Sequence, residues 1–90
     1  MINYKKPTSI MLSVLRDLAE GSYLVRHLHA GAISPIQIFA PKQGFVSSVG
    51  RATWVGLLDR SLIECFERRE YKHEKYRINS RGRKVLRRDG

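Results

Sequence analysis

The order of secondary structure is clearest in residues 49–86, VGRATWVGLLDRSLIECFERREYKHEKYRINSRGRKVL. Apolar positions at helical spacing predict a helix over about residues 48–60, with Ser47 or Ser48 as its N-cap. Alternating apolar and polar residues then predict two strands joined by a charged turn over about residues 63–79. A short basic helix is expected to follow, so the predicted order is helix, hairpin, helix.

This order of elements resembles the winged helix-turn-helix family, whose small domains place one helix in a DNA major groove and a hairpin against the neighbouring backbone. Many members have a threonine three turns ahead of a Gly-Leu-Ile, with a leucine between them. The matching residues are Thr53, Leu57, Leu62 and Ile63, with Ser61 in place of the glycine. Serine tolerates a positive φ poorly, so the chain departs from the family at this helix exit. Residues 76–82 resemble the family's strand-to-helix corner, where a threonine, here Asn79, caps the last helix.

The resemblance, which covers roughly residues 8–20 and 46–88, implies an α+β fold of the winged helix-turn-helix type. Such a fold has three helices and a C-terminal β-hairpin wing, here a recognition helix at about 48–60 and a basic wing at about 63–79. The implied function is that of a transcriptional regulator that binds double-stranded DNA sequence-specifically, as a homodimer on a two-fold site. Small basic regulators of this kind are common in phages and mobile elements.

Candidate DNA contacts are of two kinds: contacts to phosphates, which position the protein on the duplex, and contacts to base edges, which select the sequence. Ser47 and Ser48 are expected to donate to a phosphate, and Arg51 to reach guanine bidentately. Trp54 is a minor candidate, because a tryptophan at such a position is more often a core residue or a dimer contact. The full set of candidates is Ser47, Ser48, Arg51, Trp54, Arg60, Arg68, Arg69, Lys72, Lys75, Arg77, Arg81, Arg83 and Lys84.

The charge of the chain favours a polyanionic partner. The sequence has 17 lysines and arginines against 8 aspartates and glutamates, which gives a net charge of +9 and a pI near 10.3. Seven of the cations lie between Lys75 and Arg88, a stretch without an acidic residue. Nucleic acid is therefore the first expectation for a partner, ahead of an anionic membrane surface or an acidic protein.

The first half of the chain gives one clear element and one open question. Thr8 or Ser9 is expected to cap a helix that ends near Gly21. Its apolar positions are Met11, Val14, Leu15 and Leu18, at helical spacing. Residues 22–45 contain short β-rich runs interrupted by glycine and proline. They form either an added β-hairpin, or a strand and a short irregular helix in place of the motif's usual second helix.

Several classes of protein are disfavoured. A chain of 90 residues is expected to form one domain, 1–90, and it contains no apolar run long enough to cross a membrane, so a soluble, cytoplasmic protein is expected. The single Cys65 excludes an internal disulfide and is predicted to be an inert, buried thiol. His27 and His29 would lie on one side of a strand, but two ligands are too few for a metal site. We therefore expect no enzyme activity, no metal and no cofactor.

The alternative is a protein-interaction module of the same fold that binds an acidic partner through exposed Trp54, Leu58 and Tyr71. The outward face of the 48–60 helix distinguishes the two functions, because a polar, basic face favours DNA and an apolar face favours protein. The sequence predicts a mixed face. The cations on either side of this helix decide the prediction in favour of DNA.

Overall fold

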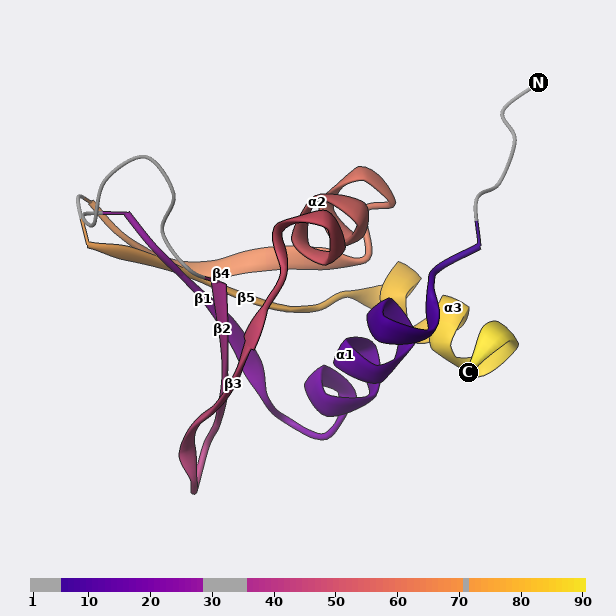
Figure 1. The fold of residues 1–90 in the computed structure, drawn as a ribbon, viewed down its shortest axis with the longest axis horizontal. Coiled ribbons are helices and arrows are strands. Elements are labelled where there is room, and N and C mark those ends of the chain that lie inside the picture. Colours follow the sequence, from indigo (N-terminus) through magenta and orange to yellow (C-terminus); the bar gives the residue numbers. More distant parts are fainter. Residues whose placement is uncertain (1–5, 29–35, 71) are drawn as a thin grey trace.

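The computed structural model describes residues 6–28, 36–70 and 72–90, which form three helices and five strands (Figure 1). The elements in chain order are α1 (Ser9–Ala19), β1 (Tyr23–His27), β2 (Ile36–Ala40), β3 (Gly44–Val49), α2 (Arg51–Asp59), β4 (Ile63–Arg69), β5 (His73–Ile78) and α3 (Ser80–Asp89). The fold is thus α+β, as the sequence predicts.

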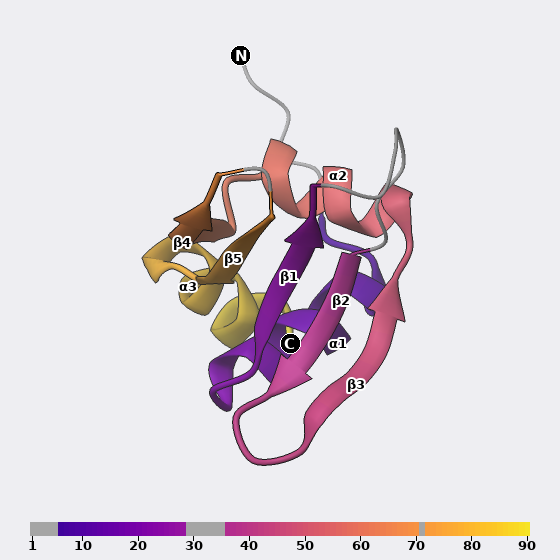
Figure 2. The same cartoon turned by 90° about the vertical axis from the view of Figure 1, so that its left-hand side faces the viewer.

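One antiparallel sheet joins the five strands in the order β3-β2-β1-β5-β4. The central strand is β1, which pairs with β2 on one side and with β5 on the other. Figure 2 shows one face of the sheet toward the viewer, with α1 and α3 behind the sheet and α2 above them. The helices therefore cover one face, and we call the opposite face the open face.

The first helix has the predicted caps. The Thr8 hydroxyl accepts a hydrogen bond from the backbone N–H of Met11, at 3.2 Å. Gly21 follows the helix with a φ of 107°, a conformation that glycine adopts without steric cost. The predicted apolar stripe is buried and faces the sheet and the other two helices; it consists of Met11, Val14, Leu15 and Leu18.

The sequence leaves two structures open for residues 22–45, and the structure shows the β-hairpin, which is formed by β2 and β3. This hairpin continues beyond residue 45, so the predicted N-caps Ser47 and Ser48 lie in β3, paired with Ile38 and Gln37. The prediction of a serine N-cap is wrong, because these residues are held extended by their neighbours in β2. Helix α2 begins at Arg51 after Gly50, which makes no side-chain capping bond.

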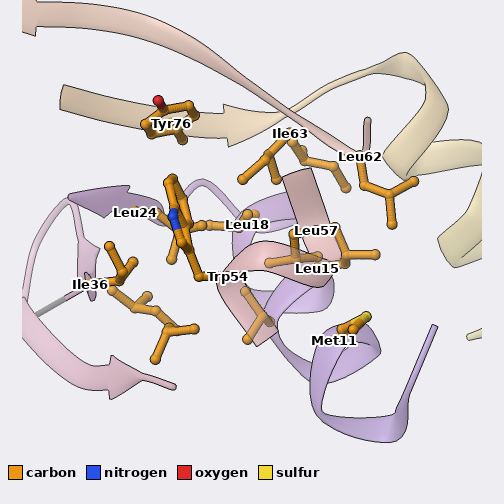
Figure 3. Packing of buried hydrophobic residues seen from close by; sticks show 14 of the residues in the cluster. Met11, Leu15, Leu18, Leu24, Ile36, Trp54, Leu57, Leu62, Ile63 and Tyr76 are labelled. Atoms are coloured by element: carbon orange, nitrogen blue, oxygen red, sulfur yellow. The ribbon is translucent and has the colours of Figure 1, made fainter. Parts of the chain in front are cut away.

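The hydrophobic core lies between the helices and the covered face of the sheet (Figure 3). Trp54 is only 6% exposed and packs edge-on against Tyr76, with ring centroids 4.8 Å apart. This contact attaches α2 to β5. On another side of α2, Gly56 lies so close to Met11 that a Cβ there would clash with the methionine side chain. Trp54 is therefore a core residue, and its inclusion among DNA contacts or exposed docking residues is wrong.

The exit of α2 is fixed by a hydrogen-bonded corner. Ser61 has a φ of 55°, the left-handed conformation that serine adopts at a cost of about 1 kcal/mol or more. The Asn79 amide donates to the Ser61 carbonyl at 2.8 Å, and its side-chain oxygen accepts from the Gly82 N–H at 2.8 Å. Asn79 thus caps α3, as predicted, and also holds the turn after α2.

Candidate nucleic-acid interface

The outward face of α2 is mixed. Its exposed residues are Arg51, Ala52, Val55, Leu58 and Asp59. Arg51 lies in the first turn, whereas Arg60, just after the helix, is half-buried and donates to the Gly56 carbonyl at 3.1 Å. Val55 and Leu58 are 41% and 38% exposed. This face offers one outward cation, one acid and two aliphatic side chains.

Ion pairs hold most of the cations in the β4–β5 hairpin. Arg77 contacts Glu64 at 3.0 Å, and Lys75 contacts Glu67 at 3.2 Å. Hydrogen bonds from His73 and Lys75 lower the pKa of Glu67, so this carboxylate stays ionised further into acid. Arg69 has no ion pair within the described parts of the chain and is exposed beside the turn. The predicted basic wing is therefore a surface of mixed charge.

A buried carboxylate links β5 to both neighbouring strands. The Glu74 side chain, 9% exposed, contacts Arg68 at 2.8 Å and Arg26 at 3.3 Å. The Tyr76 hydroxyl donates to the same carboxylate at 3.1 Å. Burial, and then the charge of Glu74, raise the pKa of Tyr76, while the charge of Glu74 raises that of Arg68. Two arginines from the two strands beside β5 thus share one acid, so neither presents its full charge to a ligand.

Helix α3 carries the densest positive charge. Gly82 and Val85 are buried, and most of the exposed residues of the helix are cations. Exposed cations without an ion pair in the described ranges are Arg81, Arg83, Lys84 and Arg87. In Figure 1, α3 lies at the right of the molecule and the outer end of the β4–β5 hairpin at the left, with α2 between them. The predicted contacts therefore divide between two surfaces.

Other predicted residues are placed differently from expectation. Ser47 and Ser48 are exposed on β3 and do not form the start of α2. Cys65 is exposed, so the prediction of a buried thiol is wrong. It lies on an edge strand beside a bulge, where the helices do not cover it. Tyr71 and His29 fall outside the described residues.

The aromatic side chains of the sheet are not among the residues predicted for a site. Tyr23 lies between Phe39 and Phe66, with ring centroids 6.0 and 6.1 Å away, and Phe39 contacts Phe45 at 6.0 Å. We call these four residues the aromatic row. Each aromatic residue belongs to a different strand, so no local motif reveals the row. Its only signal in the sequence is an aromatic residue within each of four β-rich runs.

Comparison with known proteins gives no relative for this chain: no family model, no curated protein and no solved structure matches it. None of the helices within residues 6–28, 36–70 and 72–90 has the length and apolar character needed to cross a membrane. Those same residues contain no group of three or more histidine, cysteine, aspartate or glutamate side chains placed to hold a metal ion.

Proposed function

We propose that this protein is a transcriptional regulator that binds double-stranded DNA through α2 and the β4–β5 hairpin, in the manner of a winged helix. The observation that carries the proposal is the contact of Trp54 with Tyr76, which fixes α2 against the hairpin while Arg51 stays exposed. A helix held beside a two-stranded hairpin is the arrangement with which winged helices contact a groove and the adjacent backbone. In chain order, the β2–β3 hairpin lies between α1 and α2, where a winged helix has its second helix.

The N-terminus of α2 adds to this proposal. Gly50 supplies no side-chain capping bond to α2, so an external acceptor could take its place at the first N–H groups of the helix. A phosphate there would also interact favourably with the helix dipole. Arg51, one residue later, would then lie beside the backbone and close to base edges. In this proposal, the N-terminus of α2 binds the phosphate that Ser47 and Ser48 were expected to bind.

The proposed contacts set the expected salt dependence. Arg51, Arg69 and Lys72 lie on the α2 and hairpin side, whereas the cations of α3 lie at the other end of the molecule (Figure 1). A duplex on α2 would meet about four phosphate-binding groups, including the helix N-terminus. The slope of log K against log salt should then be about −3 to −4.

Binding of a fluorescent 20-base-pair duplex at low and moderate salt tests the proposal. Lys72→Ala should weaken binding to all duplexes and flatten the salt slope by about one unit, whereas Arg51→Ala should reduce discrimination between sequences. The matched control is Lys42→Ala, which removes the same charge from the turn of the other hairpin. Equal effects of Lys72→Ala and Lys42→Ala, or no binding at low salt, would contradict the proposal.

A second candidate function is the docking of an acidic protein on α2. The exposed aliphatic side chains Val55 and Leu58 favour it, because DNA backbone contacts have no use for them. Leu58→Ser separates the two functions, because it should weaken the docking of a protein strongly, whereas duplex affinity, which depends mainly on the cations, should change only slightly. A duplex that does not bind would leave the docking function as the better explanation of this face.

A further inference from the structure

The open face of the sheet carries the aromatic row across four strands. Phe45 lies on β3, Phe39 on β2, Tyr23 on β1 and Phe66 on β4. The rings of Tyr23 and Phe39 are within 14° of parallel, and those of Tyr23 and Phe66 meet edge to face. Figure 2 shows that none of the three described helices, α1, α2 and α3, covers this face. The two rings at the ends of the row, Phe45 and Phe66, are 54% and 41% exposed.

Cations accompany the rings at one end of the row. The Lys75 ammonium lies 5.3 Å from the centre of the Tyr23 ring, and the Arg77 guanidinium lies 5.6 Å from the centre of the Phe66 ring. A pocket of about 240 Å³ opens beside them, lined by Tyr23, Phe66, Arg77 and Arg83 among others. Arg83 is exposed and has no ion pair in the described parts of the chain. Aromatic and cationic groups therefore face the same space.

This combination matches the chemistry of an unpaired nucleotide chain. Exposed rings offer stacking surfaces for bases, and neighbouring arginines and lysines contact phosphates. We propose that the open face binds single-stranded nucleic acid, with bases on the four rings of the aromatic row and phosphates at Lys75, Arg77 and Arg83. This site lies on a different surface from α2 and does not depend on duplex binding there.

A single strand fits this face better than a DNA duplex or a second copy of the chain does. A duplex keeps its base faces stacked inside, so it could not use the rings. A second copy of the chain would bring another molecule of charge +9 against this one, including its own Arg83. Charge complementarity therefore favours an anionic strand.

Two carboxylates of the β4–β5 hairpin pair with cations that the proposal assigns to phosphates, and should therefore weaken binding. Glu64 holds Arg77, and Glu67 holds both Lys75 and the imidazole of His73. An incoming phosphate would compete with these carboxylates for Lys75 and Arg77. Neutralising the acids should therefore strengthen binding, an effect that a purely structural function of these residues would not produce.

Fluorescence anisotropy with labelled ten-nucleotide oligo(dT) and oligo(rU) at low salt tests the proposal. Phe66→Ala, at an exposed position, should weaken binding by roughly fivefold or more, because one stacking surface is lost. Phe45→Ala should weaken it in the same direction. The double variant Glu64→Gln and Glu67→Gln should tighten it. Ile10→Ala, a truncation of a still more exposed apolar side chain on α1, is the control and should leave affinity unchanged.

Three results would overturn the proposal. The first is an absence of single-strand binding at low salt, and the second is binding that Phe66→Ala and Phe45→Ala leave intact, since contact would then be through charge alone. The third is a dimer, seen by sedimentation, that Phe66→Ala dissociates, because a second copy would then cover the face. The duplex probe with Lys72→Ala reports on α2 separately, so failure of either site is distinguishable from failure of the other.

Discussion

The two hairpins that flank β1 have the same topology and opposite chemistry. Each adds two antiparallel strands to the sheet, and each contains a bulge. Residues 36–49, which form β2 and β3, include a single charged residue, Lys42, whereas residues 63–78 include nine. The first hairpin is held by apolar side chains on the core side and rings on the open face. The second adds ion pairs between its strands and to β1.

This difference shows that a hairpin of this sheet can form almost without charge, so the many charges of β4 and β5 have effects beyond the ion pairs that join the strands. Charged side chains on the edge strand β4 discourage its pairing with other chains. They also place cations at the surface next to α2 and next to the aromatic row. The edge strand β3 has no charged residue, and its bulge is the device that interrupts pairing there.

The strongest test of the comparison concerns the apolar anchoring of the β2–β3 hairpin. Ile38 is almost fully buried on the core side, whereas Phe45 is the most exposed ring of the aromatic row. Ile38→Ala should lower the free energy of unfolding by about 2–4 kcal/mol, through lost burial and a residual cavity. Phe45→Ala is the control within the same hairpin and should cost less than about 1 kcal/mol. Urea unfolding measures both, and similar losses would mean that the open face stabilises the fold as much as the core.

A smaller effect is expected from the buried carboxylate of the other hairpin. Glu74→Gln keeps the size of the side chain but removes the charge shared by Arg26 and Arg68, so we expect a loss of about 1–2 kcal/mol. Glu64→Gln, on the exposed side, should cost about 0.5 kcal/mol or less. Unfolding at neutral pH compares the two variants. A larger loss for Glu64→Gln would mean that the exposed ion pairs, rather than the buried one, hold this hairpin.

The smallest effect is the pH dependence of the exposed pair on β4. The pKa of Glu67 is lowered in the folded state from its ordinary value of 4.5, first by the hydrogen bond from His73 and then by that from Lys75. The ionised form is therefore favoured by folding, so its stabilising contribution is present above about pH 4.5 and is lost as the pH falls through the folded-state pKa. The carbon chemical shift of the Glu67 carboxyl, followed by NMR, measures this pKa directly. A midpoint at or above that of an unstructured glutamate would contradict the expectation.

Local signals in the sequence predicted much of this fold. Thr8, one of the two residues predicted as the N-cap of α1, is the cap, and Asn79 caps α3 as the resemblance to winged helices implies; both act on an N–H group three positions away. The β4–β5 hairpin follows from alternation over a few residues. The turn at Ser61 depends on Asn79, 18 positions along the chain, and only the structure shows that bond.

The errors come from features that depend on distant partners. Ser47 and Ser48 are as suited to a strand as to a helix start, and pairing with β2 decides between the two. Cys65 was expected to be buried because it lies beside Phe66 in a predicted strand, but it is exposed on β4, an edge strand with a bulge at this point. The aromatic row could not be predicted, because the order of the strands had to be known before its rings could be brought together.

The central position of β1 determines when the sheet can be completed during synthesis. Arg26 pairs with Ile36 close by in the chain and with Glu74 much further along. As the chain emerges from the ribosome, the β2–β3 hairpin can join β1 early, while the other edge of β1 has no neighbour until β5 has been made. During that interval, the unpaired backbone of β1 is open to other chains, so a truncated protein lacking β5 should depend on chaperones to avoid aggregation.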